Sequence, residues 1–385
     1  MPNANLSRAK NAKNDEFYTQ WHDIEREVNA YLEFDPGIFR DKTILCPCDD
    51  PYESKFFKYF ALHFNDFGLK KLIATCHKDF PIANTYLSLF ADESEEEGTA
   101  KKPHVIEVTE SPDMNNGGAA DSVDIELLLA SSGNHLTRLK GNGDFRSEEV
   151  KRLRDGADFI ITNPPFSLFR EFLAWIMKAK KQFLVITNMN AVTYKEVFPL
   201  IKENKIWLGV SNGAKEYVKP DGTMQKMGNT CWFTNLEHGR RHQPLTLMTL
   251  EDNLKYSRHK EIRGKTAYDR YDNYDAIEVP FTDAIPDDYG GIMGVPISFL
   301  DKYCPEQFEI LGATQRGCHD EVPDTRKYDD YWEVKPDGTP TGSSGGKTNE
   351  NANLLQNDGK KNYFINKEGR IIQSAYQRIF IKKKA

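Results

Sequence analysis

The chain has 385 residues, of which 39% are hydrophobic and 28% charged, and this composition excludes disordered and fibrous proteins. At roughly 100–200 residues per domain the length predicts two domains; no apolar run approaches the roughly 18 residues of a membrane helix, and six cysteines are too few for a disulfide framework. The net charge of −7 hides two basic stretches, 151–265 with 20 basic against 11 acidic residues and 360–385 with 8 against 1. We therefore expect a cytoplasmic protein with no membrane contact, and the charge leaves binding to a polyanion open.

The first 235 or so residues alternate between short apolar strands and amphipathic helices. We predict four strands, at Thr43–Cys46, Leu72–Thr75, Asp158–Thr162 and Gln182–Thr187. The last two are continuous apolar runs, which are typical of strands buried on both faces. We also predict helices at Pro51–Leu62 and Ser167–Lys180, the second with Ser167 as its N-cap. Strand–helix–strand units at this spacing predict an α/β fold with a mostly parallel sheet and helices on both faces.

The alternation stops after about residue 250, and the composition changes. Residues 335–362 are rich in Gly, Ser and Asn and are predicted to form a loop, which is followed by short strand-like pieces at 363–366 and 373–382. We therefore expect a smaller, mixed and loop-rich C-terminal region.

The sharpest motif is Asn163-Pro164-Pro165-Phe166, which lies directly between a predicted buried strand and a predicted helix. Ligands of open α/β sheets bind at such strand ends, and two prolines donate no hydrogen bonds and leave carbonyls free. The side chain of Asn163 and the carbonyl of Pro164 can accept both hydrogens of an exocyclic amino group, which prepares its nitrogen for attack. Phe166 offers a ring on which an extruded base can stack. The alternative is a rigid strand-to-helix turn with a core phenylalanine.

This tetrapeptide resembles the catalytic motif of amino-group DNA methyltransferases that use S-adenosylmethionine, and the whole chain resembles the EcoRI-type adenine-specific methyltransferases. The matching segments are Lys13–Thr19, Ile44–Pro51 with Glu53, Ser54 and Phe56, Gly143–Phe145, Trp232–Asn235 and Gly294–Phe308. The resemblance implies a Rossmann-like domain for cofactor binding and catalysis at 1–245, and a target-recognition and DNA-binding region at 246–385.

The resemblance also implies which residues bind S-adenosylmethionine. They are Phe17, Tyr18, Thr19, Cys48, Asp49, Asp50, Pro51, Ser54, Asp144, Phe145 and Asn163. Asp49 and Asp50 can bind the ammonium group or the ribose of the cofactor, but capping of the following helix explains them as well. Asp144 can accept a hydrogen bond from the cofactor adenine while Phe145 packs on its ring; the alternative is a helix capped at Ser147.

The usual acidic residue after the second strand is replaced by Thr75-Cys76-His77-Lys78, so the sequence leaves the ribose ligand open. Cys46, Cys48, Cys76 and His77 lack the usual spacing of zinc ligands. We predict no metal site and interpret the thiols as buried.

The resemblance predicts transfer of a methyl group to the N6-amino group of an adenine flipped out of double-stranded DNA, with Asn163, Pro164, Pro165 and Phe166 as the catalytic residues. Three alternatives stay open: an RNA adenine methyltransferase, a protein-glutamine methyltransferase and a catalytically silent DNA-binding relative. We expect a monomer in the cytoplasm of a bacterium or of a phage-infected cell. The sequence leaves open the recognition site and whether a cognate restriction endonuclease acts on it.

Overall fold

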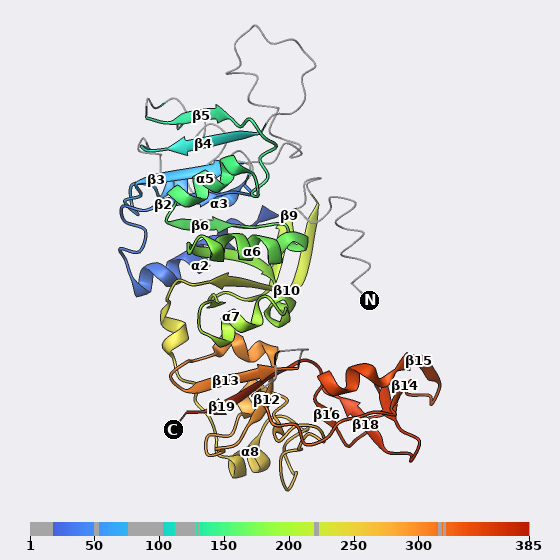
Figure 1. Cartoon of the computed structure of the whole chain (residues 1–385). Coiled ribbons are helices and arrows are strands. Elements are labelled where there is room, and N and C mark those ends of the chain that lie inside the picture. Colours follow the sequence, from blue (N-terminus) through green and yellow to red (C-terminus); the bar gives the residue numbers. More distant parts are fainter. Residues whose placement is uncertain are drawn as a thin grey trace. The chain divides into compact units, whose positions relative to one another are not determined.

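The computed structural model describes residues 18–49, 54–75, 103–111, 128, 131, 133–218, 223–314, 318 and 321–384. The chain divides into two compact units (Figure 1), one formed by residues up to 189 together with 207–239, the other by 190–206 together with 240 onward. The functional division expected at residue 245 stays a prediction. Within the described ranges, no helix is both long and apolar enough to cross a membrane.

The first unit is built on a mixed sheet of ten described strands. Its centre is four parallel strands in the order β7-β6-β2-β3. Their bounds are β2 (Thr43–Cys46), β3 (Lys71–Thr75), β6 (Phe159–Thr162) and β7 (Gln182–Asn188). These match the four predicted strands to within one residue at each end, because continuous apolar runs of this length are typical of strands buried between two layers of helices.

Antiparallel strands flank this centre on both sides, so the prediction of a mostly parallel sheet is wrong for the edges. One edge carries β4 (His104–Val108) and β5 (His135–Arg138), and the other carries β10 (Met224–Thr234), β9 (Gly213–Val218), β1 (Tyr18–Thr19) and β8 (Trp207–Leu208). The outer half of β10 alternates between partly buried and exposed residues, as strands with one solvated face do. Only a few residues separate β9 from β10, and so short a connection joins antiparallel strands.

Helices cover both faces of the parallel centre (Figure 1). On one face, α2 (Trp21–Phe34) and α3 (Lys55–Leu62) pack on Ile44 and Cys46 of β2 in one apolar core. On the other face lie α5 (Glu148–Gly156) and α6 (Phe169–Lys178). Helix α3 begins at Lys55 because the hydroxyl oxygen of Ser54 accepts the backbone N–H groups of Phe56 and Phe57, at 3.1 and 3.3 Å.

The prediction that Ser167 caps the helix after β6 is wrong. Phe166–Leu168 form a 3₁₀ turn, η2, and α6 begins only at Phe169. The backbone N–H of Leu168 donates to the carbonyl of Pro165 at 2.9 Å, an i to i+3 bond that tightens the chain after the two prolines. Ser167 therefore lies inside this turn.

The second unit contains two smaller sheets, with α7 (Phe198–Lys202) and α8 (Leu250–Tyr256) as its described α-helices. One sheet has the order β11-β12-β19-β13 and consists of β11 (Ile277–Glu278), β12 (Met293–Pro296), β13 (Phe308–Ala313) and β19 (Arg378–Lys383). The other has the order β15-β14-β17-β18-β16 and consists of β14 (Trp332–Val334), β15 (Pro340–Ser344), β16 (Asn353–Leu354), β17 (Tyr363–Ile365) and β18 (Ile371–Ser374).

The strand-like piece predicted at 363–366 is confirmed as β17, whereas the piece predicted at 373–382 covers the end of β18 and most of β19. The predicted loop at 335–362 is interrupted by β15 and β16. The sequence of β15, Pro-Thr-Gly-Ser-Ser, has no apolar alternation, so nothing in its pattern indicates a strand.

Candidate active site

The helices that connect the parallel strands lie on one face of the sheet after β2 and on the other face after β6. Helix α3 leads from β2 to β3 on one side, whereas α6 leads from β6 to β7 on the other side. In open α/β sheets the crevice outside the carboxyl ends of two such strands is where ligands bind. Asp49 follows β2 and Asn163 follows β6. The topology therefore places the predicted cofactor loop and the predicted catalytic motif at one ligand-binding position.

A single buried carboxylate joins the strand ends at this position. Asp49 is only 6% exposed. Its Oδ1 accepts a hydrogen bond from the hydroxyl of Ser54 at 2.6 Å, and its Oδ2 accepts one from the hydroxyl of Thr162 at 2.5 Å. Its backbone N–H donates to the carbonyl of Thr75 at 3.2 Å. Residues at the ends of β2, β3 and β6 and the N-cap of α3 therefore meet at Asp49.

The predicted catalytic motif follows β6 directly, and its last residue begins η2. Pro164 is buried, whereas Asn163, Pro165 and Phe166 are partly exposed. Pro165 has φ −53° and ψ 122°, and its carbonyl accepts the N–H of Leu168. The turn therefore uses the carbonyl of Pro165, and not the Asn163 side chain or the Pro164 carbonyl that are predicted to accept from a substrate amino group.

The predicted adenine-binding pair has partners of its own. Asp144 accepts the backbone N–H and the Nε–H of Arg146, both at 2.8 Å, and the Nη2–H at 2.6 Å. These hydrogen bonds to Asp144 raise the pKa of the Arg146 guanidinium above its usual range. Phe145 is buried against the rings of Phe172 and Trp175, with centroids 5.1 and 5.7 Å away. The roles of Asp144 and Phe145 toward the cofactor stay predictions.

The capped helix after this pair is confirmed. The hydroxyl oxygen of Ser147 accepts the N–H of Val150 at 3.3 Å and begins α5. Ser147, and not Asp144, therefore caps the helix.

The remaining predicted cofactor residues divide into those that the structure describes and those outside it. Outside the described residues lie Phe17, Asp50 and Pro51, and also Cys76, His77 and Lys78. Tyr18 and Thr19 form β1, which pairs with β9, and Cys48 is half-buried in the loop after β2. Cys46 is fully buried, and burial together with the nearby Asp49 carboxylate raises the pKa of its thiol well above the usual range.

Two residues of this site were missed from the sequence. Thr162 was assigned only to a buried strand, and Thr75 only to the place of a missing acidic residue. Thr75 is fully buried, and its hydroxyl donates to the carbonyl of Pro47 at 3.1 Å. A threonine at the last position of an otherwise apolar strand is the only signal that could have indicated either residue, because its hydroxyl needs a partner where the strand ends.

Comparison with known proteins identifies the family. Residues 5–384 match the profile of the family described as adenine-specific methyltransferase EcoRI. The chain is 41% identical to the Type II methyltransferase M.EcoRI of Escherichia coli over 323 residues, which cover 80% of this chain and 88% of that protein. It is 35% identical to M.MpnI of Mycoplasma pneumoniae, over 80% of this chain and 84% of that protein. No solved structure matches the chain. The chain belongs to the EcoRI-type family of adenine-specific methyltransferases, and it is a site-specific DNA adenine methyltransferase.

Proposed function

We propose that the protein transfers the methyl group of S-adenosylmethionine to the N6-amino group of an adenine flipped out of duplex DNA, in the crevice between β2 and β6. The observation that carries this proposal is the position of Asn163-Pro164-Pro165-Phe166 at the carboxyl end of β6, next to the loop that follows β2. Four parallel strands between two layers of helices support a Rossmann-like domain. The relatives are named Type II methyltransferases, which favours DNA over RNA or protein as the substrate.

The residues at the strand ends fit this cofactor. S-adenosylmethionine supplies a methyl group on a positively charged sulfonium and also carries an ammonium group and ribose hydroxyls. The buried carboxylate of Asp49 lies in the loop after β2, where it accepts from the hydroxyls of Ser54 and Thr162. A carboxylate can accept hydrogen bonds from an ammonium group or from ribose hydroxyls. The other predicted binding residues are Phe17, Tyr18, Thr19, Cys48, Asp50, Pro51, Asp144, Phe145 and Asn163.

The catalytic motif acts on the target amino group. The lone pair of the amino nitrogen is delocalised into the adenine ring, so this nitrogen is a poor nucleophile. The Asn163 side-chain oxygen and the Pro164 carbonyl accept its two hydrogens and thereby concentrate electron density on the nitrogen. Phe166 stacks on the extruded base and holds it in line for attack. The surplus proton of the methylated nitrogen is then lost to solvent.

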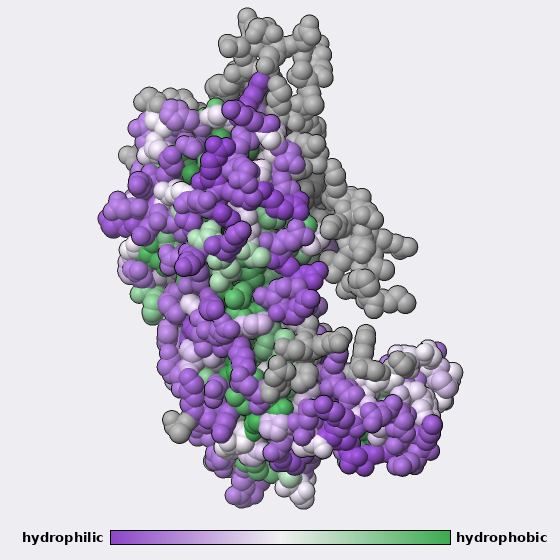
Figure 2. All heavy atoms as spheres, viewed as in Figure 1, coloured by the Kyte–Doolittle hydropathy of each residue, from purple (hydrophilic) through white to green (hydrophobic). Residues whose placement is uncertain are grey.

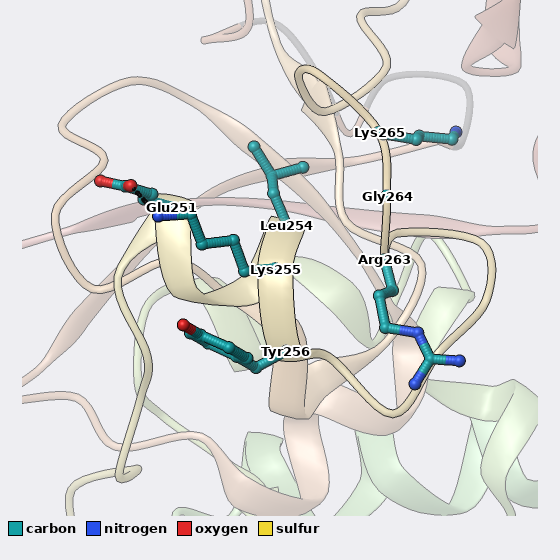
Figure 3. Close-up of a pocket in the computed structure, with 7 residues that line it drawn as sticks. All are labelled: Glu251, Leu254, Lys255, Tyr256, Arg263, Gly264 and Lys265. Atoms are coloured by element: carbon teal, nitrogen blue, oxygen red, sulfur yellow. Dashed lines mark hydrogen bonds and ion pairs between the residues drawn. The ribbon is translucent and has the colours of Figure 1, made fainter.

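Exposed cations of the second unit are proposed to bind the DNA backbone. They lie at the end of α8 and after it, and consist of Lys255, Arg258, Lys260, Arg263 and Lys265. Three of them, Lys255, Arg258 and Lys265, have ion pairs with exposed or partly exposed carboxylates, so Lys260 and Arg263 are the main candidates. Lys255, Arg263 and Lys265 line the surface pocket of Figure 3, in which Arg263 extends away from the ion pair of Glu251 with Lys255. Contacts between such side chains and phosphates fix the position of a protein on the duplex without reading its sequence.

The small sheet β14–β18 is proposed to read the recognition site. Its visible surface in Figure 2 is mostly hydrophilic to weakly polar, as a surface facing DNA base edges requires. Its turns carry exposed Lys335, Lys360 and Lys361. This assignment agrees with the recognition region predicted at 246–385.

The lysines at the C-terminus are less suited to bind phosphate than the sequence indicates. The Nζ of Lys383 binds the Asp287 carboxylate at 2.6 Å, and that of Lys384 donates to the carbonyl of Pro305 at 2.6 Å. Lys382 lies opposite Glu309 in the pairing of β19 with β13. We therefore assign these lysines mainly to the packing of β19.

The proposal also includes a partner enzyme and an oligomeric state. A cognate restriction endonuclease acting on the same site fits the Type II names of the relatives. A monomer fits an enzyme that modifies one strand of its site at a time.

Transfer of labelled methyl from S-adenosylmethionine to unmethylated genomic DNA, followed by digestion to nucleosides, tests the proposal. We expect the label in N6-methyldeoxyadenosine. Label in RNA or in a protein amide, with none in DNA, would replace this proposal by one of the alternatives. A folded protein that transfers no label to any of the three would be a silent DNA-binding relative.

A further inference from the structure

The hydrogen bond between Thr162 and Asp49 connects two segments that belong to different steps of the reaction. Thr162 is the last residue of β6 and is bonded covalently to Asn163 of the catalytic motif. Asp49 belongs to the loop after β2 that is predicted to bind the cofactor. The hydroxyl of Thr162 donates to Oδ2 of Asp49 at 2.5 Å, and both side chains are buried.

The backbone pairing between β2 and β6 ends before the catalytic motif begins. The pairing of β2 with β6 ends at Leu45 and Ile160, whereas β6 stays paired with β7 up to Thr162 and Val185. On the β2 side, the Thr162–Asp49 hydrogen bond connects the two segments directly before the motif. A β-branched side chain has few χ1 rotamers, so a hydroxyl fixed to a carboxylate also restrains the backbone that carries it.

The other carboxylate oxygen of Asp49 binds a residue at the start of α3. Its Oδ1 accepts from Ser54, the residue whose hydroxyl oxygen caps α3. The two hydrogen bonds of Asp49, to Thr162 and to Ser54, therefore link the catalytic motif to the start of the helix that follows the cofactor loop. Hydrogen bonds to an ionised carboxylate are stronger than hydrogen bonds between neutral groups. We therefore expect the two buried hydrogen bonds of Asp49 to be strong.

We propose that Thr162 is a positioning residue, whose hydrogen bond to Asp49 sets the placement of Asn163 and Pro164 relative to the bound methyl donor. This inference rests on the proposed function, because it assigns to Thr162 a role in that same reaction. Methyl transfer needs the donor carbon and the acceptor nitrogen in line, and a displacement of about 1 Å can cost on the order of 100-fold in rate.

The test compares three variants. Thr162→Val keeps the shape of the side chain and removes its hydroxyl, whereas Thr162→Ser keeps the hydroxyl. Thr234→Val is the matched control: Thr234 is a fully buried threonine of β10 whose hydroxyl donates to the carbonyl of Phe183 at 2.7 Å. It pairs with Leu184 of β7, and β7 separates its strand from β6 in the sheet.

We expect Thr162→Val to lower kcat by about 10- to 100-fold, with the dissociation constant of S-adenosylmethionine within about threefold of wild type. Thr162→Ser should restore kcat to within about threefold, and Thr234→Val should leave it unchanged even where it lowers the melting temperature. If Thr162→Val keeps kcat within twofold of wild type, or if Thr234→Val loses as much, the positioning role is wrong.

Amide hydrogen exchange gives a readout that does not depend on methyl transfer to DNA. In Thr162→Val we expect the amides of residues 163–168 to exchange at least about tenfold faster than in wild type and in Thr234→Val. Equal exchange rates of these amides in all three proteins would show that the Thr162–Asp49 hydrogen bond does not restrain the motif. Absence of label in adenine with wild-type protein would instead overturn the proposed function, and the exchange rates would still decide the role of Thr162.

Discussion

Each of the two units buries carboxylates, and one from each unit, Asp49 and Glu278, can be compared by its partners. In the first unit, Asp49 accepts from the hydroxyls of Ser54 and Thr162. In the second unit, Glu278 is 6% exposed and binds the guanidinium of Arg378, with Nη2 to Oε1 at 2.5 Å, and the Tyr271 hydroxyl.

The two carboxylates differ in whether these side-chain partners include a charged group. An arginine neutralises the carboxylate that it binds, so Glu278 and Arg378 together carry no net charge and connect β11 to β19 across β12. A hydroxyl donor carries no charge, so it does not neutralise the carboxylate that it binds. We assign Asp49 to the cofactor because it follows β2 at the crevice, and Glu278 to the packing of the sheet.

Other buried acids do not divide by unit, since Asp23 of the first unit binds the buried ammonium of Lys215 at 3.0 Å. Glu27 of α2 is fully buried and accepts from the backbone N–H groups of Val210 and Ser211, at 2.8 and 2.7 Å. In the second unit, Asp272 binds the guanidinium of Arg370 at 2.5 Å, and the guanidinium of Arg326 lies 3.3 Å away. Glu27 lies away from the crevice, so donors without charge are not by themselves the mark of a site.

The largest expected effect is that of Asn163→Ala on the rate. Removing one of two acceptors for the amino group should lower kcat by about 10²–10³-fold, the usual loss for one preorganised hydrogen-bonding group in the transition state. Binding of S-adenosylmethionine, measured by calorimetry, should stay within a few-fold of wild type.

Asn235→Ala is the matched control for that variant. The side chain of Asn235 bonds the backbone of Phe183 and Lys181, at 2.9 and 3.0 Å, where β7 begins. We expect it to lower stability and keep kcat. Activity of Asn163→Ala within a few-fold of wild type would remove Asn163 from the catalytic site.

The next largest effect concerns stability, and it tests the second unit. Arg378→Met leaves the buried Glu278 carboxylate without its guanidinium, and breaking such a pair costs about 3–5 kcal/mol. Urea denaturation should show this loss. Arg258→Met, which removes a 78% exposed guanidinium from Asp283, should change the free energy of unfolding by about 1 kcal/mol or less. Equal losses in the two variants would contradict the scaffold role of Arg378.

A smaller effect is expected at Asp144. Asp144→Ala should weaken S-adenosylmethionine binding by about tenfold or less, the size of one hydrogen bond. Arg146→Ala serves as the control, since it releases the Asp144 carboxylate without removing it and should leave affinity near wild type. A dissociation constant of Asp144→Ala equal to that of wild type would assign Asp144 to holding Arg146 alone.

The smallest effects separate two groups of cations in the second unit. Neutralising Lys260 and Arg263 should weaken DNA binding across all sequences and reduce the salt slope by about one to two. Neutralising Lys383 and Lys384, which have partners within the unit, should leave the slope nearly unchanged. A larger change from the C-terminal pair would show that these lysines exchange their partners for phosphates.

Much of the fold could be predicted from the sequence, and the reason lies in the periodicity. The apolar runs of β2, β3, β6 and β7 are long enough to indicate buried strands, and the residues between them have helical spacing. Strand β15 and the start of α6 could not be predicted. The first lacks apolar residues, and the second depends on the Pro165–Leu168 hydrogen bond, which local sequence preference does not indicate.

For the candidate site, the motif and its position at a strand end could be predicted, but its partners could not. Asp49 and Thr162 are 113 residues apart in the chain, and only the pairing of β2 with β6 brings them together. The partners of Asp144 and Lys383 depend in the same way on side-chain positions. A single sequence indicates which residue types are available for chemistry, but not which of them already have partners.

The most direct test of the contrast between the units is the affinity of two matched variants for S-adenosylmethionine. Asp49→Asn and Glu278→Gln each replace a buried carboxylate by an amide of the same shape, one in each unit. Calorimetry should show binding weakened at least about tenfold in Asp49→Asn and unchanged in Glu278→Gln. Wild-type affinity in Asp49→Asn, or an equal loss in Glu278→Gln, would contradict the assignment of the cofactor to the crevice between β2 and β6.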